Sequence, residues 1–429
     1  MSRIAFFTLF LLLAILLGGV SCVTSKKPAA FAKDPLGQIL STLDRRDTLA
    51  HRVLSHSNTY EIQIIYTQID RDAAGNPHFT SYKYLVDSTR YFYPASMVKM
   101  PLALLSLEKM NNLRRSGYPK LTRNTPYKLD SLRAFQQPYQ TDTTAPDNKP
   151  SIAHDVRQIF VVSDNLAYNH TFEFLGRQYI NQTLHDKGYT QTGIVHRFNY
   201  PGRDNRYTSP ITFFDKSGSS IFKENERFDP NEWVTPQHNT LKGRGYLNGK
   251  DSLILQPFEM GKKNWFALTD MEKMIRAVMF PKAVPEANRF NLTEDDYQFV
   301  WKYMSIFPRE CDYPHYNSKE NYDGYVKFFM FGDGKEQRDG KIRVFNKVGE
   351  AYGTLTDAAY IVDFENKVEF ILAATILCNS DGIFNDNIYD YDQTGFPFLA
   401  RLGRAVHAHE LQRKRTVVPD LSKFSKIHE

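Results

Sequence analysis

Three consecutive β-rich runs near the carboxyl end of the chain most constrain what it can fold into. They cover Lys341–Lys347, Thr356–Phe364 and Val368–Leu377. A further run, YEIQIIYTQI from Tyr60 to Ile69, alternates apolar and polar residues, and the turn residues Ala73–Asn76 connect it to an expected partner strand around Tyr82–Val86. This alternation is typical of half-buried strands, and short connections favour antiparallel pairing. The sequence therefore predicts antiparallel strands near both ends of the chain.

Between these strands the apolar residues are mostly spaced as in helices. Expected helices cover Leu36–Leu54, the segment that begins at Ser96, Asp155–Gly176, Phe266–Phe280, Asp295–Met304 and Phe398–Arg413. Residues 211–265 are polar and rich in turns, and they are interpreted as an insertion with a hairpin of its own. The 429 residues, 41% of them hydrophobic, fit a single catalytic domain from residue 34 to 429.

The first 21 residues have the anatomy of a signal peptide, with Arg3, the apolar run Ile4–Leu17 and small residues before Cys22. The sequence GGVSC resembles a bacterial lipobox, which would make Cys22 the lipidated first residue of the mature chain, followed by a tether to Lys33. We therefore expect secretion across the inner membrane and a lipid anchor in the cell envelope, with the domain facing the periplasm or the surface. Cys311 and Cys378 could pair or stay free there.

Charge and motifs exclude several other classes of function. The net charge is +6, but the basic residues are scattered except for Arg413–Arg415, so no nucleic-acid partner is expected. The sequence has no H-E-x-x-H, no C-x-x-C and no phosphate-binding glycine loop, and His407 and His409 do not share a helix face. We expect a monomer that uses neither a metal nor a cofactor.

The run YFYPASMVKM places Ser96 and Lys99 three residues apart at the start of an expected helix, on one face of it. A lysine whose charge is suppressed by burial can accept the serine proton, which would make Ser96 a nucleophile. A second copy of the pattern, Ser106 and Lys109, follows on the same helix and is expected on a solvated face. Taken alone, the motif does not separate a catalytic pair from two ordinary surface residues.

Two later motifs change the interpretation. Ser163-Asp164-Asn165 comes next, and Lys347-Val348-Gly349 begins the strand-rich run NKVGEAYGTLTDAAYIVDFENKVEFILAATI. This order resembles the class A β-lactamase and penicillin-binding protein superfamily. Lys216-Ser217-Gly218 matches the consensus of the third motif, lysine, then serine or threonine, then glycine, better than Lys347-Val348-Gly349 does. It lies in the polar insertion with no apolar strand before it, and we therefore reject it. The resemblance covers residues 59–377 apart from the insertion.

The resemblance implies an α/β (α+β) fold, in which helices flank an antiparallel sheet and a second, all-helical subdomain adjoins it. It also implies roles for single residues. Ser96 would attack an acyl carbon, Lys99 would accept its proton, and Ser163 would relay a proton while held near Lys347. Asn165 would contact a substrate amide.

The resemblance also places the substrate-binding strand. Lys347, Gly349 and Glu350 would line the substrate site, and Asp164 would brace its own loop. The backbone N–H groups of Ser96 and Glu350 would form an oxyanion hole, the first of them helped by the positive end of its helix.

The chain departs from the family in the loop that carries the deacylating glutamate of class A β-lactamases. The matching region, Gly193–Pro210, contains no glutamate and offers Asp204 as its carboxylate. His196 is either a substitute base or a packing residue. The sequence therefore predicts slow deacylation.

A second departure concerns the substrate. Val348 stands where the family has a hydroxyl that helps bind the substrate carboxylate, and Glu350, two residues on, faces the same side with a negative charge. A like charge disfavours a carboxylate ligand. The preferred acyl substrate is therefore expected to lack the carboxylate of penicillins or to carry a cation in its place.

The leading hypothesis is an envelope-anchored serine hydrolase that forms an acyl-serine on a small-molecule β-lactam or a related, cell-wall-like amide or ester. A penicillin-binding D,D-peptidase or an esterase would share that chemistry. A catalytically idle binding lipoprotein, using the insertion as an interaction surface, is the alternative from another class. The joint presence of Ser96, Lys99, Ser163 and Lys347 favours an enzyme, because a binding module does not need all four.

Overall fold

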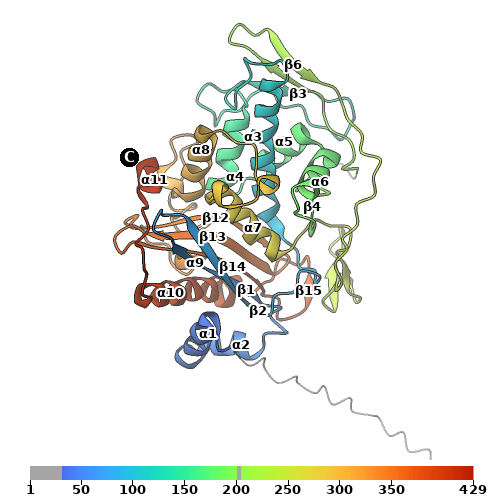
Figure 1. Cartoon of the computed structure of the whole chain (residues 1–429). Helices are drawn as coiled ribbons and strands as arrows, with labels where there is room; N and C mark the ends of the chain where they lie inside the picture. Colours follow the sequence, from blue (N-terminus) through green and yellow to red (C-terminus); the bar gives the residue numbers. More distant parts are fainter. Residues whose placement is uncertain (1–30, 201–203, 429) are drawn as a thin grey trace, which may run out of the picture.

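The centre of the molecule is a five-stranded antiparallel sheet (Figure 1). The computed structural model describes residues 31–200 and 204–428. The strand order is β12 (Ile342–Ala351), β13 (Thr354–Asp363), β14 (Val368–Leu377), β1 (Gln63–Arg71) and β2 (Pro77–Tyr84). β1 pairs with β14, so that Tyr66 lies opposite Leu372. The early and late β-rich runs therefore form one sheet.

The two faces of the sheet bury different sets of residues, because successive side chains of a strand point to opposite sides. On β12, Val344 and Val348 pack with α1 (Pro35–Arg46), α2 (Thr48–Ser55) and α10 (Phe396–Gln412) in one apolar core. Phe345, on the same strand, packs in the other core with α7 (Leu268–Met279) and the helical region. The sheet is thus covered by helices on both faces, as Figure 1 shows.

The helical region lies beyond α7 in Figure 1. Its helices are α3 (Lys99–Arg115), α4 (Ile152–Val161), α5 (Asn165–Leu175), α6 (Arg177–Asp186) and α8 (Glu294–Ser305). α3 is buried on all sides from Lys99 to Met110, which explains its apolar sequence. Pro101 is tolerated because it lies in the first turn, where a backbone N–H has no partner within the helix.

The remaining elements are short. In residues 211–265, β5 (Ile211–Phe214) and β6 (Ser220–Glu224) form a hairpin beside β3 (Tyr127–Leu129), as expected for this segment. The other small strands are β4 (Thr192–Gly193), β7 (Leu241–Lys242), β8 (Gly245–Leu247), β9 (Leu253–Ile254), β10 (Phe258–Glu259), β11 (Trp265–Phe266) and β15 (Ile383–Phe384). Two short helices are α9 (Phe328–Phe331) and α11 (Ser422–Ser425).

Two of the expected elements differ from the structure in detail. The helix expected over Leu36–Leu54 is two helices, because Asp47 ends α1 and its side chain caps α2 by accepting a hydrogen bond from Ala50 N (2.9 Å). The strand expected around Tyr82–Val86 begins earlier, at Pro77. Apolar alternation does not mark the start of this strand, because its apolar residues Pro77, Phe79 and Tyr82 are unevenly spaced.

The prediction of a solvated face for Ser106 and Lys109 is wrong. Both side chains are buried. Lys109 Nζ donates to the Phe174 carbonyl oxygen (2.7 Å) and pairs with Glu224 (2.8 Å), and its nitrogen lies 4.5 Å from the centre of the Phe174 ring. These partners compensate the amine for its loss of water, so the second Ser-Lys pattern is part of the packing of α3.

The cysteines and the amino terminus complete the comparison. Cys311 and Cys378 are buried and unpaired. Cys22, the signal peptide and most of the tether lie outside the described residues. Within residues 31–200 and 204–428, every helix is too short or too polar to cross a membrane.

Candidate active site

Ser96 lies in a single 3-10 turn, Ala95–Val98, that continues directly into α3. Ala95 has a positive φ of 47°, which is uncommon for a residue with a side chain and is typical of strained functional turns. Ser96 is half-buried, while its neighbours on both sides are buried. The turn therefore presents this hydroxyl at the edge of the core.

Strand β12 lies directly against this turn. A methyl group on Gly349 would come within 2.4 Å of the Pro94 carbonyl oxygen and 3.3 Å of Met97 N. Only a glycine permits so close an approach. Gly349 therefore brings the strand that carries Lys347 beside the strained turn.

Lys99 begins α3 and is fully buried. Its Nζ donates to Asn165 Oδ1 (2.7 Å) and to the carbonyl oxygen of Ser163, and it lies 3.3 Å from Ser163 Oγ. A neutral amine has two N–H groups and one lone pair. With two donors engaged by these oxygens, the lone pair is available to accept a proton.

Ser163 connects the two lysines. Lys347 Nζ donates to Ser163 Oγ (2.7 Å) and to the Val348 carbonyl oxygen (2.9 Å). Ser163 has a positive φ of 60°, and the next residue, Asp164, caps α5 by accepting from Ala167 N (2.8 Å). The cap fixes the turn that aims Ser163 between Lys99 and Lys347, which is the bracing expected of Asp164.

Burial controls the charge of both lysines. It lowers the pKa of Lys99 to about 7, against the opposing effect of the negative charge of Asp164. Burial also lowers the pKa of Lys347 well below its usual range, and the nearby charge of Lys99 acts in the same direction. Two adjacent buried amines resist carrying two positive charges, so an uncharged lysine is accessible near neutral pH.

A second buried cluster lies behind Lys347. Lys327 Nζ donates to Asn346 Oδ1 (2.8 Å), and Asn346 Nδ2 donates to Asp357 Oδ1 (2.9 Å). Burial raises the pKa of Asp357 to about 7 and lowers that of Lys327 to about 7. Nothing in the sequence predicts a role for Lys327, because a single lysine outside a motif looks like any surface lysine.

A cavity of about 820 Å³ opens in front of Ser96. Its lining includes Ser163, Asn165, Val348 and Glu350, together with several tyrosines and asparagines. Within the described part of the chain, Lys99 and Lys347 are not among the lining residues. This volume is in the upper part of the range of small-molecule sites. Of the predicted site residues, the cavity is thus lined by Ser96, Ser163, Asn165 and Glu350. Lys99 and Lys347 lie behind it and reach it through Ser163 Oγ, and Gly349 packs against the serine turn.

The loop that forms one wall, 193–200, is held by buried amide side chains. Asn264 Oδ1 accepts from Val195 N (2.7 Å) and His196 N (3.1 Å), and Asn169 Oδ1 accepts from Phe198 N (2.9 Å). The sequence gives no sign of the role of either asparagine, because a single asparagine outside a motif looks the same whether it is buried or exposed.

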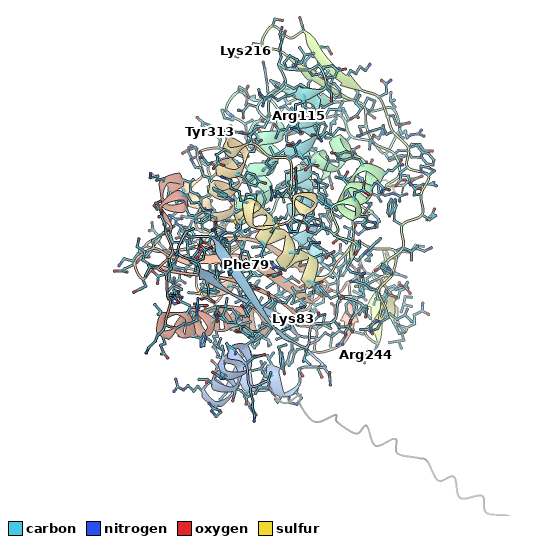
Figure 2. The ribbon with its side chains drawn as sticks, viewed as in Figure 1. Phe79, Lys83, Arg115, Lys216, Arg244 and Tyr313 are labelled. Carbon is cyan, nitrogen blue, oxygen red and sulfur yellow. The ribbon has the colours of Figure 1, made fainter. Side chains whose placement is uncertain are left out.

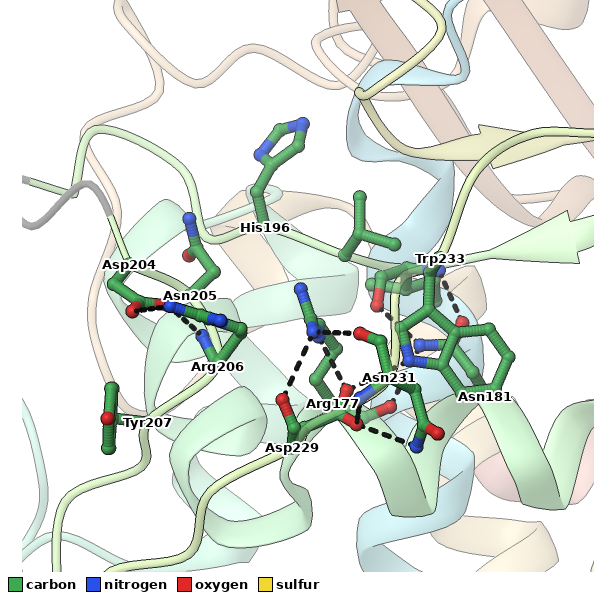
Figure 3. A network of polar contacts seen from close by, with 12 residues as sticks. Arg177, Asn181, His196, Asp204, Asn205, Arg206, Tyr207, Asp229, Asn231 and Trp233 are labelled. Carbon is green, nitrogen blue, oxygen red and sulfur yellow. Dashed lines mark hydrogen bonds and ion pairs between the residues drawn. The ribbon is translucent and has the colours of Figure 1, made fainter.

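The same wall is supported from outside by a polar network (Figure 3). Arg177 Nε pairs with Asp229 (2.6 Å), which also accepts from Trp233 Nε1 (2.9 Å). Asp204, the carboxylate expected in this loop, is paired with Arg206 (2.7 Å) and does not line the cavity within the described residues. It is therefore not placed to act on a substrate.

His196 lines the cavity and points away from that network, as Figure 3 shows. Its Nδ1 lies 2.8 Å from the Arg197 carbonyl oxygen, which can only accept, so Nδ1 carries the proton and Nε2 the lone pair. Burial lowers the pKa of His196 to about 4. The side chain is thus neutral at pH 7 and a weak base.

The rejected motif Lys216-Ser217-Gly218 lies far from this cavity. It forms the exposed turn of the β5–β6 hairpin, where Asp215 accepts from Ser217 N (2.9 Å). Figure 2 labels Lys216 at the end of the molecule opposite α1 and α2. Of the two candidates for the third motif, it is Lys347 that contacts Ser163 in the described structure.

A serine and a lysine one helical turn apart, beside an antiparallel sheet with an all-helical region, define the class of serine hydrolases with a β-lactamase-like fold. The chain belongs to the β-lactamase enzyme family, whose sequence model matches residues 50–287, more than half of its length. No curated protein sequence matches the chain.

Several solved structures are distantly similar. The chain is 12% identical to a β-lactamase from Sphaerobacter thermophilus, with a TM-score of 0.45 over 88% of this chain and 98% of that chain. The chain is 13% identical to PBP-A, with a TM-score of 0.46 over 87% of this chain and 94% of that chain. It is 11% identical to the β-lactamase from Streptomyces albus G, with a TM-score of 0.44 over 87% of this chain and 99% of that chain. A mutant of PBP-A was solved as an acyl-enzyme complex with penicillin G.

Proposed function

We propose that this chain is a serine hydrolase that forms an acyl-serine at Ser96 on a β-lactam or a related amide or ester, and releases it slowly. The observation that carries the proposal is the environment of Lys99. This lysine is fully buried, its pKa is lowered to about 7, and it contacts both Ser163 and Asn165 one helical turn from Ser96.

In the acylation step, Ser96 Oγ adds to the carbonyl carbon while its proton passes to the lone pair of Lys99 Nζ. The bond to the leaving group then breaks, and Ser163 Oγ, 2.7 Å from Lys347 Nζ, gives its proton to the departing atom. Ser163 Oγ takes in exchange the proton that Lys99 Nζ, 3.3 Å away, received from Ser96. The backbone N–H groups of Ser96 and Glu350 stabilise the oxyanion, since Gly349 holds β12 against the serine turn.

Slow deacylation follows from the composition of the cavity wall. A general base must be able to activate a water next to the ester. In the described part of the wall, Glu350 is the lining carboxylate, and it extends from the strand that supports the oxyanion hole. His196 offers a neutral nitrogen whose pKa of about 4 makes it a weak base. Water activation is therefore the slow step.

A D,D-peptidase or an esterase would use the same acylation step and differ only in the leaving group. The envelope setting is part of the proposal: Cys22 would carry a lipid that anchors the domain to the membrane, and the catalytic domain would act as a monomer.

The test is intact-mass spectrometry of the domain without residues 1–22 after timed incubation with penicillin G, in parallel with Ser96→Ala. A fluorophosphonate that labels reactive serines is the second reagent. The proposal expects one adduct per chain that requires Ser96 and persists for many minutes.

An adduct that forms and disappears as the penicillin is consumed would show that the acyl-serine is released quickly, and the protein would then be a true β-lactamase. Labelling by the fluorophosphonate but not by penicillin would confine the activity to other acyl substrates. If neither reagent labels the wild-type serine, the proposal is wrong.

A further inference from the structure

Strand β12 presents a negative charge where, by the family resemblance, a penicillin carboxylate would need a positive one. Lys347 is 2% exposed, and its Nζ is engaged by Ser163 Oγ and the Val348 carbonyl oxygen. Glu350, by contrast, is an exposed residue of β12 that lines the cavity. On β12, the carboxylate of Glu350 therefore faces the cavity, whereas the amine of Lys347 is buried.

No cation of the described chain neutralises Glu350. Among the described residues it forms no ion pair, and its neighbour across the β12–β13 pair is Leu355, an apolar residue. Partial desolvation raises the pKa of Glu350, and the charge of Asp392 raises it further. The carboxylate of Glu350, with no ion-pair partner in the described residues and with the charge of Asp392 nearby, attracts a positively charged group.

The surroundings of Glu350 are aromatic. Tyr325 and Tyr391 line the same cavity. Burial raises the pKa of both phenols, and the negative charge of Glu350 acts in the same direction, so the carboxylate lies near both phenolic hydroxyls. A carboxylate beside two tyrosines suits an ammonium group, because phenolic oxygens accept its hydrogen bonds and aromatic rings also attract cations.

Two cations from the described residues line the cavity, Lys263 and Arg197. Lys263 Nζ lies 5.3 Å and 5.1 Å from the ring centres of Phe258 and Tyr352. The Nε atom of Arg197 pairs with Glu173 (2.8 Å). Neither of these cations contacts Glu350 in the structure, so the site beside Glu350 is open to a cation from the substrate.

We propose that Glu350, together with Tyr325 and Tyr391, binds a cationic group of the substrate, so that the preferred substrate is an ester or amide with an ammonium group near the bond that breaks. This inference rests on the acyl-serine reaction proposed above and names its substrate class. With a cationic thioester, the Ser96 oxygen forms a bond to the carbonyl carbon and the carbon–sulfur bond breaks. The thiol then departs with the serine proton, and water later hydrolyses the acyl-serine.

Three thioesters with the same hippuryl acyl group test the subsite. Their leaving groups are thiocholine, a neutral isostere in which carbon replaces the ammonium nitrogen, and thioglycolate. Release of thiol is followed with a disulfide dye, and kcat/KM is measured for the wild type, Glu350→Gln and Glu350→Asp. Glu365→Gln is the matched control, because this glutamate is exposed in the turn between β13 and β14, at the opposite end of the strands from Glu350.

The wild type should favour the thiocholine ester over its neutral isostere by about tenfold, with thioglycolate the poorest of the three. Glu350→Gln should abolish the preference, Glu350→Asp should retain part of it, and Glu365→Gln should retain all of it. The double variant Val348→Thr, Glu350→Ala should be acylated by penicillin faster than the wild type.

Two results would overturn the subsite: equal rates for the cationic ester and its isostere in the wild type, or a preference that survives in Glu350→Gln. The first result compares two esters on the wild-type protein, so it does not depend on whether any variant folds. If none of the three esters releases thiol faster than with Ser96→Ala, the acyl-serine reaction itself is wrong, and that failure is distinct from loss of the cation preference.

Discussion

The pKa of Lys99 makes a quantitative prediction about how acylation depends on pH. An ordinary lysine with a pKa of about 10.5 is uncharged in roughly 0.03% of molecules at pH 7. Because burial lowers the pKa of Lys99 to about 7, about half of the molecules carry an uncharged Lys99 at that pH. Burial thus increases the population of competent base about a thousandfold.

Lys99 accepts the serine proton only when it is uncharged, so acylation should rise with pH and level off above the pKa. We expect a half-maximal rate near pH 7 and about a tenfold fall for each pH unit below pH 6. The assay is the rate of adduct formation at Ser96 under single-turnover conditions, followed by intact mass between pH 5 and pH 9.

Asp164→Asn is the sharper perturbation. The negative charge of Asp164 favours the charged form of Lys99, so its removal should lower the pKa of Lys99 and move the half-maximal point by up to about one unit to lower pH. Asparagine can still accept the hydrogen bond from Ala167 N that caps α5, so the turn is kept.

The reasoning fails if the acylation rate is flat between pH 5 and pH 8, or if its midpoint lies above pH 9. It also fails if Asp164→Asn leaves the midpoint unchanged or moves it upward while thermal unfolding shows an intact fold. Either result would remove Lys99 from the role of base.

Three further predictions concern stability and release. Lys99→Met should be inactive but more stable at pH 7 by about 1–2 kcal/mol in urea unfolding, because a buried amine that is protonated in the unfolded chain costs free energy when it folds. That cost is complete below pH 7 and fades as pH rises toward 10.5, so the advantage of methionine should shrink over the same window. Asn199 lines the cavity, next to Phe198, whose ring centre is 5.2 Å from Lys99 Nζ. A carboxylate at position 199 would supply a base, so Asn199→Asp and Asn199→Glu should shorten the lifetime of the penicillin adduct at least about tenfold. Asn199→Gln should leave that lifetime unchanged. Asn264→Ala should destabilise the protein by about 2–3 kcal/mol, since it leaves unpaired the backbone N–H groups of the buried Val195 and the half-buried His196. An unchanged urea midpoint would contradict the role of this amide.

The sequence predicted much of the sheet and the helices, because their residue patterns are local. Alternation identified β1, β13 and β14 to within a few residues, and helical spacing identified α7 and α8. It failed for the first half of β2, where the apolar residues are unevenly spaced, and for the break at Asp47, where a single cap decides whether one helix continues or two form.

The candidate residues were found by their order along the chain, but that order contains no distances. Ser106 and Lys109 have the same spacing as Ser96 and Lys99, and the sequence separated the two pairs only through the later motifs. Their environments differ for a tertiary reason: Lys109 meets Glu224 from a distant hairpin, whereas Lys99 meets Ser163 and Asn165.

The sequence by itself determined which chemical groups are present: a serine and a lysine one helical turn apart, a glutamate after Gly349, and a loop that contains no glutamate. The tertiary structure decided their protonation and their neighbours. A pKa depends on desolvation and on charges brought together from distant segments, which no local pattern encodes. Only the folded chain places Lys347 against Ser163 and leaves Glu350 facing an aromatic cavity without a partner in the described residues, and that placement decides which substrates the cavity favours.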